Sequence, residues 1–189
     1  IPMKRLVPLL EITHSTFPIE KLGGIYAFLD GFSGEKKTAS DYQTLAQMQL
    51  RRVYIGVETG SDDLLRSLKK PGCAADAVQT VAALKQAGIS VGVIFLLGVG
   101  GKKFAAQHVR ESIRVINAMQ LDLDDILYFS ELVEHEGMEY TRSAYAHNYT
   151  PLNAAERAAQ EEEITAALRF TETSGIPHIS RYDIREFVY

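Results

Sequence analysis

The sequence of 189 residues contains a single cysteine, Cys73, and no tryptophan. One cysteine excludes an internal disulfide and points to a reducing compartment, so we predict a cytoplasmic protein. No run of apolar residues approaches the ~20 that are needed to cross a bilayer. We also recognise no signal or transit peptide, and therefore expect no membrane association.

A large excess of positive charge is also missing. The formal net charge is -4, which argues against a nucleic-acid-binding protein held mainly by phosphate contacts. Hydrophobic residues make up 46% and charged residues 23%, as expected for a soluble globular domain with its own core. The chain opens with Ile1-Pro2 and a helical pattern rather than with an initiator methionine, so we expect it to be a piece of a longer protein.

The most informative stretch comprises residues 51–63. Its apolar run Val53–Val57 is rich in β-branched residues and predicts a strand buried on both faces. Glu58 follows directly, where the strand leaves the core, and Ser61 can cap the helix that comes next. Because ligands bind beyond the carboxyl ends of strands in parallel α/β folds, Glu58 is the first candidate for a functional residue.

The same strand-to-helix pattern repeats along the chain, and the strand starts lie roughly 30 to 40 residues apart, the length of a βα unit. Four parallel strands cannot close an eight-stranded barrel, so we predict an α/β fold with an open sheet or a partial barrel. Ser40 is the expected N-cap of one helix, and the tail Ile179–Tyr189 is either a further strand or a segment packed on the domain. The predicted strands are residues 24–29, 53–57, 91–97 and 125–132, and the predicted helices are residues 2–15, 40–50, 61–69, 74–87, 104–119 and 153–173.

Right-handed crossovers bring the carboxyl ends of all four strands to one edge of the sheet. The glycine-rich exit Gly98–Lys102 is either a phosphate-binding turn or a plain strand-to-helix turn. It lacks the Gly-Lys-Ser/Thr ending of a Walker loop, so the plain turn is preferred. The residues expected at this edge are Asp30 and Ser33, Glu58 and Thr59, Gly98 to Lys102, and Ser130 to Glu134.

Other groups carry weaker signals. The acidic run around Glu131, Glu134, His135 and Glu136 has no spacing typical of a zinc site, so we predict a solvated loop and no metal site. Cys73 stands at a helix N-cap, where a thiol can be reactive, although a simple turn residue is favoured. The other histidines, which are His14, His108, His147 and His178, are interpreted as surface or core residues.

Three features form a combined pattern between Ser40 and about Tyr140. Residues 53–62 read Val-Tyr-Ile-Gly-Val-Glu-Thr-Gly-Ser-Asp, and the turn Lys70-Pro71-Gly72 follows. Residues 84–101 lead through a strand ending Phe-Leu-Leu-Gly-Val-Gly-Gly, and a further strand precedes a glycine near an acidic loop. In this order the features resemble the radical S-adenosylmethionine (radical SAM) superfamily, with residues 53–62 similar to its fourth strand and ribose motif.

The resemblance implies a fragment of a (β/α)6 barrel of parallel strands in residues 1–150, which starts at the second helix of the barrel. A C-terminal helix and tail in residues 151–189 are expected to pack on it. The family's CxxxCxxC loop, which holds a [4Fe-4S] cluster, is not in this sequence, and Cys73 cannot replace its three cysteines. The resemblance therefore implies SAM and the cluster in the full-length enzyme, but no bound cofactor and no activity in this fragment.

The resemblance also assigns cofactor contacts. It implies that Glu58 hydrogen-bonds the ribose hydroxyls of SAM, because a carboxylate accepts from two neighbouring donors. Gly56 and Gly60 would let the backbone approach the ligand, and Thr59 belongs to the same motif. At the end of the fifth strand, Leu97 and Gly98 would lie beside the adenine. After the sixth strand, Leu132 and Val133 would contact the adenine through their backbone.

The implied chemistry is reductive cleavage of SAM to a 5′-deoxyadenosyl radical, which abstracts hydrogen from a substrate. The sequence indicates neither the substrate nor the catalytic residues. Two alternatives stay open, namely a half-barrel that binds a nucleotide or phosphate without radical chemistry, and a barrel retained for assembly. Exposed strand edges, where the missing strands belong, predict self-association of the fragment.

Overall fold

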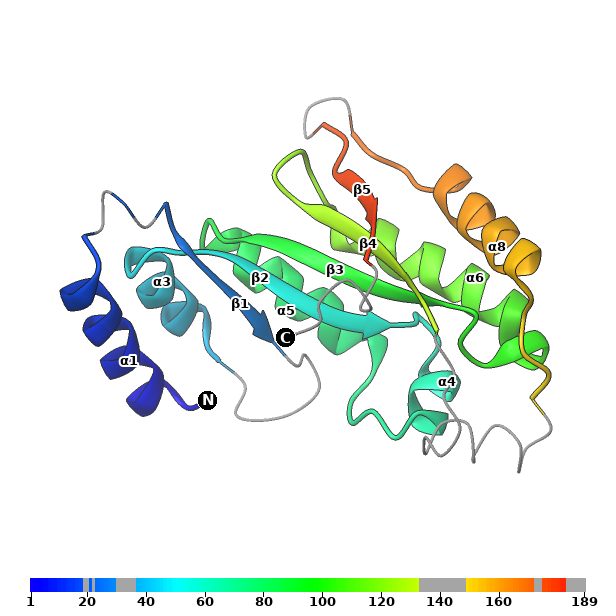
Figure 1. The fold of residues 1–189 in the computed structure, drawn as a ribbon, viewed down its shortest axis with the longest axis horizontal. Helices are drawn as coiled ribbons and strands as arrows, with labels where there is room; N and C mark the ends of the chain where they lie inside the picture. Colours follow the sequence, from blue (N-terminus) through cyan, green and yellow to red (C-terminus); the bar gives the residue numbers. More distant parts are fainter. Residues whose placement is uncertain (19–20, 22, 30–36, 133–148, 172–174, 183–189) are drawn as a thin grey trace.

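One sheet of five parallel strands, in the order β1-β2-β3-β4-β5, forms the centre of the molecule (Figure 1). The structure is a computed structural model that describes residues 1–18, 21, 23–29, 37–132, 149–171 and 175–182. All neighbouring strands are parallel, so their carboxyl ends lie at one edge, as predicted. The strands are β1 (Ile25–Leu29), β2 (Leu50–Glu58), β3 (Ser90–Leu97), β4 (Ile126–Glu131) and β5 (His178–Arg181).

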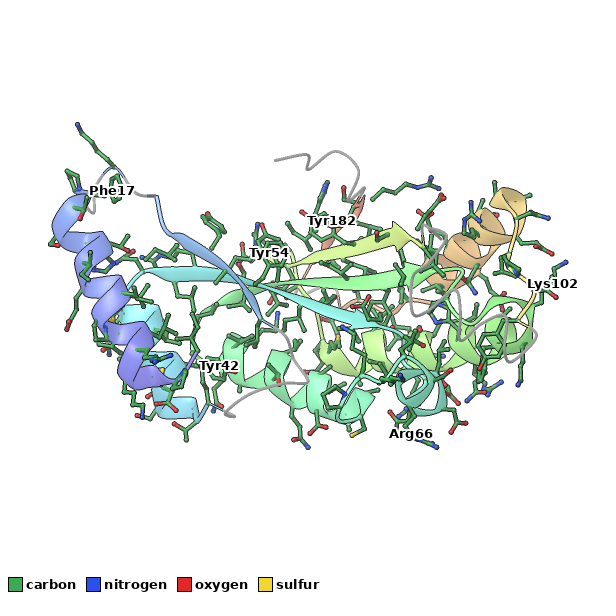
Figure 2. All side chains as sticks on the ribbon, turned by 60° about the horizontal axis from the view of Figure 1, so that its bottom comes forward. Phe17, Tyr42, Tyr54, Arg66, Lys102 and Tyr182 are labelled. Carbon is green, nitrogen blue, oxygen red and sulfur yellow. The ribbon has the colours of Figure 1, made fainter. Side chains whose placement is uncertain are left out.

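Helices alternate with these strands and pack on one side of the sheet (Figures 1 and 2). This arrangement is the predicted partial (β/α) barrel, in which the helices form the outer layer. None of the described helices is both long and apolar enough to cross a bilayer. The helices are α1 (Met3–Thr16), α3 (Ala39–Gln47), α4 (Asp62–Ser67), α5 (Ala74–Gln86), α6 (Gly101–Met119) and α8 (Ala154–Ala166).

The core lies between the sheet and the helices. In β2, Val53, Ile55 and Val57 are buried, whereas the alternate residues Tyr54 and Glu58 are half-buried. The prediction that this strand is covered on both faces is therefore wrong, because the helices cover one face only. The apolar run misled the prediction since Tyr54 and Gly56 are apolar in type yet belong to the open face.

A row of aromatic side chains crosses that open face. Phe28 stacks on Tyr54 with ring centres 5.1 Å apart, Tyr54 lies 6.2 Å from Tyr128, and Tyr128 lies 5.8 Å from Tyr182. Gly92 makes room for the row, because a Cβ there would lie 2.4 Å from Cδ1 of Tyr54. Burial and the nearby Tyr54 raise the pKa of Tyr128. Figure 2 shows Tyr54 and Tyr182 on the side of the sheet away from the helices.

The start of α3 differs from the sequence prediction. The N-cap is Thr38 rather than Ser40, because the hydroxyl of Thr38 accepts from the N–H of Asp41 and the Asp41 carboxylate accepts from the N–H of Thr38. This reciprocal capping box satisfies two N–H groups at the start of the helix. The hydrogen bonds from Thr38 lower the pKa of Asp41.

The helix α8 also ends earlier than predicted, at Ala166 instead of about residue 173. Asn117 of α6 explains the end. Its side-chain amide donates to the carbonyl of Ala167, and its Oδ1 accepts from the N–H of Arg169 across 2.8 Å. An asparagine on a neighbouring helix thus takes up backbone groups that would otherwise continue α8. Nothing in the local sequence of α8 signals this stop.

A charged cluster stabilises the amino end of the sheet. Asp125 is almost fully buried, and its carboxylate accepts from the N–H of Val91 and of Asp122. Lys85 of α5 bridges Asp125 and Asp122. Burial is the largest single influence on the pKa of Asp122 and raises it, but the hydrogen bonds from Lys85 and from the N–H of Asp124, together with the charge of Lys85, lower that pKa overall. The cluster joins α5, β3 and the turn before β4.

The C-terminal segment is attached to the sheet at β5, so the strand alternative for the tail applies to His178–Arg181. The N–H of Tyr182 donates to the carbonyl of Phe129, and Arg181 pairs with Glu161 of α8. The rest of the predicted tail, residues 183–189, lies outside the described residues. The predicted division at residue 150 stays a prediction.

Candidate cofactor-binding site

Glu58 is the last residue of β2 and stands at an irregularity of the sheet. The pairing of β2 with β3 shifts register between Gly56 and Glu58, so that Glu58 lies opposite Phe95. Its φ angle is 64°, in the left-handed region that residues with a Cβ rarely adopt. Such conformations concentrate at ligand-binding sites. The sequence placed Glu58 at the strand end but gave no sign of this backbone geometry.

The carboxylate of Glu58 lies over Gly56 on the open face of the sheet. A Cβ at position 56 would be 2.8 Å from Oε1 of Glu58, so glycine there leaves space for the carboxylate. Lys70 Nζ donates to the same oxygen across 3.2 Å. Within the described part of the chain the Glu58 carboxylate has no other hydrogen bond, which leaves Oε2 as an acceptor for a ligand.

Thr59 is fully buried, unlike Glu58 beside it. Its Oγ1 lies 2.9 Å from Nδ1 of His108 and accepts from the N–H of Ser61. The burial favours a packing role for Thr59, and its predicted place among the cofactor ligands stays a prediction. Ser61 is the N-cap of α4, as predicted, and its hydroxyl accepts from the N–H of Leu64.

Gly60 contacts a helix rather than open space. A Cβ on Gly60 would lie 2.3 Å from the carbonyl oxygen of Glu111 and 2.6 Å from the N–H nitrogen of Ser112. The N–H of Gly60 donates to Oγ of Ser112 across 3.0 Å. The close backbone approach predicted for Gly60 thus exists, but its partner is α6.

The ends of β3 and β4 are joined at the residues predicted to flank the adenine. The N–H of Leu132 donates to the carbonyl of Leu97 across 3.0 Å. The side chain of Leu97 is buried in the core, so only its backbone reaches this edge. Gly98 and Leu132 line one cavity of about 220 Å³ together with Pro151, Leu152 and Arg157. Val133 lies outside the described residues, as do Asp30 and Ser33.

The helix α8 supplies part of this cavity, which was not predicted from the sequence. The N–H of Gly98 donates to Oε1 of the buried Gln160 across 2.9 Å. Arg157 bonds Glu131 and the carbonyl of Leu152, and a Cβ on Gly98 would lie 2.9 Å from its Cδ. One signal was present, since Gln160 and Ile164 are the buried residues of α8 and a buried glutamine needs a partner.

The amino end of α6 does not have the geometry of a phosphate cradle. Thr150 occupies it, because its carbonyl accepts from the N–H of Lys102 across 2.8 Å. The same carbonyl would lie 2.3 Å from a Cβ at Gly101, so the two segments are in close contact. A free helix terminus is what an anion requires. The plain strand-to-helix turn is therefore the better interpretation of Gly98–Lys102.

The weaker candidates have local partners. Glu131 forms ion pairs with Arg157 and Arg181. Among the described residues no group of three or more His, Cys, Asp or Glu side chains could hold a metal ion. Glu134, His135 and Glu136 lie outside the described residues. Cys73 is the N-cap of α5, and its N–H donates to the carboxylate of Asp76 across 2.9 Å.

The fold and the candidate site together indicate the class of protein to which this chain is similar. The chain is a partial parallel (β/α) barrel whose carboxyl edge carries an acceptor carboxylate on β2 and a cavity beside β3 and β4. Residues 29–116, from the end of β1 to within α6, match the family model of the radical SAM superfamily. This match confirms the resemblance for that segment. A comparison with curated proteins found no match.

Several solved structures have the same fold. Coproporphyrinogen III oxidase of Escherichia coli, a radical SAM enzyme, is 10% identical with a TM-score of 0.67, and the match covers 88% of this chain and 36% of that one. Elp3 of the archaeon Methanocaldococcus infernus is 13% identical with a TM-score of 0.61, covering 83% of this chain and 38% of that one. Methylornithine synthase is 14% identical with a TM-score of 0.60, and the match covers 94% of this chain and 51% of that one. The chain therefore spans between about a third and a half of these structures.

The site suits one of the two cofactors that the family implies. Oε2 of Glu58 is an acceptor on the open face and fits a pair of ribose hydroxyls. A [4Fe-4S] cluster needs several thiolates, and the only cysteine of this chain is Cys73, which caps α5. The residues of this chain thus fit the ribose of SAM and do not fit the cluster.

Proposed function

We propose that the carboxyl edge of β2, β3 and β4 is part of the SAM-binding site of a radical SAM enzyme. The observation that supports this most is Glu58, which stands in a left-handed conformation at a register shift with one carboxylate oxygen turned to no partner in the described structure. Its role is to accept hydrogen bonds from the two ribose hydroxyls. The hydrogen bond from Lys70 to Oε1 keeps the carboxylate in this orientation.

The adenine lies towards β3 and β4 in this proposal. The cavity beside Gly98 and Leu132 has the apolar walls of Pro151 and Leu152, which suit a flat ring. The guanidinium of Arg157 borders the same cavity and is held by Glu131. The role of Gly98 is to keep this wall close to the backbone, since a Cβ there would displace Arg157.

SAM bound together with a [4Fe-4S] cluster supplies a 5′-deoxyadenosyl radical that abstracts hydrogen from a substrate. The part of this chain is to bind and orient the nucleoside portion of SAM. Because its single cysteine cannot hold the cluster, the activity belongs to the full-length protein and this segment alone is inactive. A reducing compartment such as the cytoplasm suits this chemistry.

The test is SAM affinity in the full-length protein, measured by equilibrium dialysis. Glu58→Gln keeps the size of the side chain but removes its charge, so SAM binding should weaken about 10-fold or more, the usual loss for a hydrogen bond to a charged group. Glu162→Gln, on the exposed side of α8, is the matched control and should leave the affinity unchanged. Equal affinities of the Glu58→Gln variant and the unmodified protein would remove Glu58 from the site.

A further inference from the structure

The loop of residues 59–61, which follows Glu58, is bound to α6 by hydrogen bonds. Thr59 Oγ1 and His108 Nδ1 are 2.9 Å apart, and the N–H of Gly60 donates to Oγ of Ser112 across 3.0 Å. The loop and α6 are about 50 residues apart in the sequence, and Thr59, His108 and Ser112 are completely buried. The loop is therefore held against α6 by side chains of that helix, in addition to its own local hydrogen bonds.

Two further contacts make the attachment rigid. Gln107 Nε2 donates to Oγ of Ser61 across 2.9 Å, so a third side chain of α6 reaches the loop. The missing side chain of Gly60 brings the loop backbone against the backbone of Glu111 and Ser112. Every residue of the loop thus contacts α6.

The contact with Thr59 accounts for the presence of a histidine at position 108 in the core. It stands in the buried stripe of α6, where the neighbouring buried residues include Val109 and Val115. Among the described residues its Nε2 has no hydrogen-bond partner, and its one hydrogen bond, through Nδ1, is to Thr59. Burial lowers the pKa of His108 to about 4, so the ring is neutral near pH 7 and holds Thr59 without placing a charge in the core.

The same helix is connected to the other half of the proposed site. α6 begins at Gly101, directly after the β3 exit at Gly98, and Thr150 fixes its first turn. Its middle, at His108 and Ser112, fixes the loop after β2. One straight element therefore sets the distance between the ribose side and the adenine side.

We infer that His108 and Ser112 are positioning residues for Glu58: by fixing the loop after β2 on α6, they hold Glu58 in its left-handed conformation with its carboxylate over Gly56. The inference deepens the proposed function and rests on it, because the consequence for the ligand passes through Glu58. Left-handed non-glycine residues persist only where the surrounding structure fixes them, and no other described side chain bonds the loop from the outside except Gln107.

The first measurement needs no SAM. Amide hydrogen exchange at Gly60 is compared in the unmodified protein and in Ser112→Ala and His108→Leu variants of the full-length protein. Removal of either anchor should speed exchange at Gly60 at least about 10-fold while exchange in β3 stays unchanged. Arg110→Ala, an exposed position of the same helix, is the control and should have no effect. Unchanged exchange at Gly60 in both variants would overturn the inference.

The second measurement is a double-mutant cycle on SAM affinity. His108→Leu should weaken binding about 10-fold, and His108→Asn, which can again offer a hydrogen bond to Thr59, should restore most of it. In the Glu58→Gln background His108→Leu should add less than about 2-fold, because its effect passes through Glu58. Ser112→Ala serves in the same cycle if His108→Leu does not fold.

The outcomes separate the two claims. If Glu58→Gln weakens SAM binding but the effect of His108→Leu or Ser112→Ala is fully additive with it, the positioning role is wrong and the proposed function stands. If exchange at Gly60 rises as expected but Glu58→Gln does not alter SAM binding, the anchors exist and the proposed function is wrong, and with it their role towards the ligand. Non-additive losses together with rescue by His108→Asn support both.

Discussion

The carboxylate of Glu58 rests on Gly56, its neighbour on the same face of β2, at a distance that leaves no room for a Cβ. We predict that Gly56→Ala displaces the carboxylate and weakens SAM binding about 10-fold in the full-length protein. Stability should not fall, because replacing glycine by alanine within a strand favours folding by about 0.5–1 kcal/mol. Equilibrium dialysis and thermal unfolding measured on the same samples distinguish the two effects, and a loss of both would show a general packing defect instead.

Gly60→Ala, unlike Gly56→Ala, should lower the stability of the protein. A Cβ there meets the backbone of Glu111, which cannot move without bending α6, so the free energy of unfolding should drop by about 2–3 kcal/mol. Gly88→Ala is the comparison without a steric clash: nothing lies within 4 Å of a Cβ at Gly88, although Gly88, unlike Gly60, has a positive φ. It should cost only the backbone strain, about 1 kcal/mol. Urea unfolding compares the two, and equal losses would contradict the packing argument.

Stability should depend on pH through His108. The unfolded chain takes up a proton at the ordinary histidine pKa of 6.5, whereas the folded protein does so only at about 4. Between these values the unfolded state binds more protons, so the stability present above pH 6.5 is lost as the pH falls towards 4, by up to about 3 kcal/mol. His108→Leu should flatten this part of the urea-unfolding profile. A slope that persists unchanged in the variant would assign it to other groups.

The amino end of the sheet should be sensitive to loss of Asp125. Its buried carboxylate accepts from two backbone N–H groups and from Lys85, so Asp125→Ala leaves several polar groups without a partner. We expect a loss of about 3–5 kcal/mol in the free energy of unfolding. Asp124→Ala, at the exposed position beside it, should cost less than about 1 kcal/mol, and a similar loss in both variants would argue against the cluster.

The edge strand β1 should make this segment self-associate. Among the described strands β1 pairs only with β2, and Tyr26 and Phe28 on it are 56% and 69% exposed. We predict concentration-dependent oligomers of the isolated segment in light scattering, and a shift towards monomer in Phe28→Lys, since a charge on an edge strand opposes pairing. A species that stays monomeric at high concentration would contradict this prediction.

Much of the fold followed from periodicity in the sequence. The strands were predicted because apolar runs such as Val53–Val57 end in polar or glycine residues, and the cap at Ser61 and the place of Glu58 followed from the same segment. The open face of β2 was missed, because Tyr54 and Gly56 do not differ in hydrophobic pattern from residues in the core. Whether a strand is covered on one face or two depends on where the helices pack.

The anchors of the site were hidden for a different reason. His108 and Ser112 lie four residues apart within the buried stripe of α6, and this spacing was the available signal. Polar residues at core positions of a helix require partners, but the sequence alone does not say which loop supplies them. The end of α8, where Asn117 of α6 bonds the carbonyl of Ala167, was missed for the same reason, and so was the contact of Gln160 with Gly98. Both contacts join segments that are distant in the sequence.

The aromatic row has a consequence for how a ligand would enter. Tyr54 lies on the same face of β2 as Glu58 but four residues towards the amino end, about 13 Å away along the strand. With Phe28, Tyr128 and Tyr182 it fills the inner wall at that level. In a barrel built on this sheet we expect the rings to block the interior below Glu58, so that a small molecule enters from the carboxyl edge and stops above the rings.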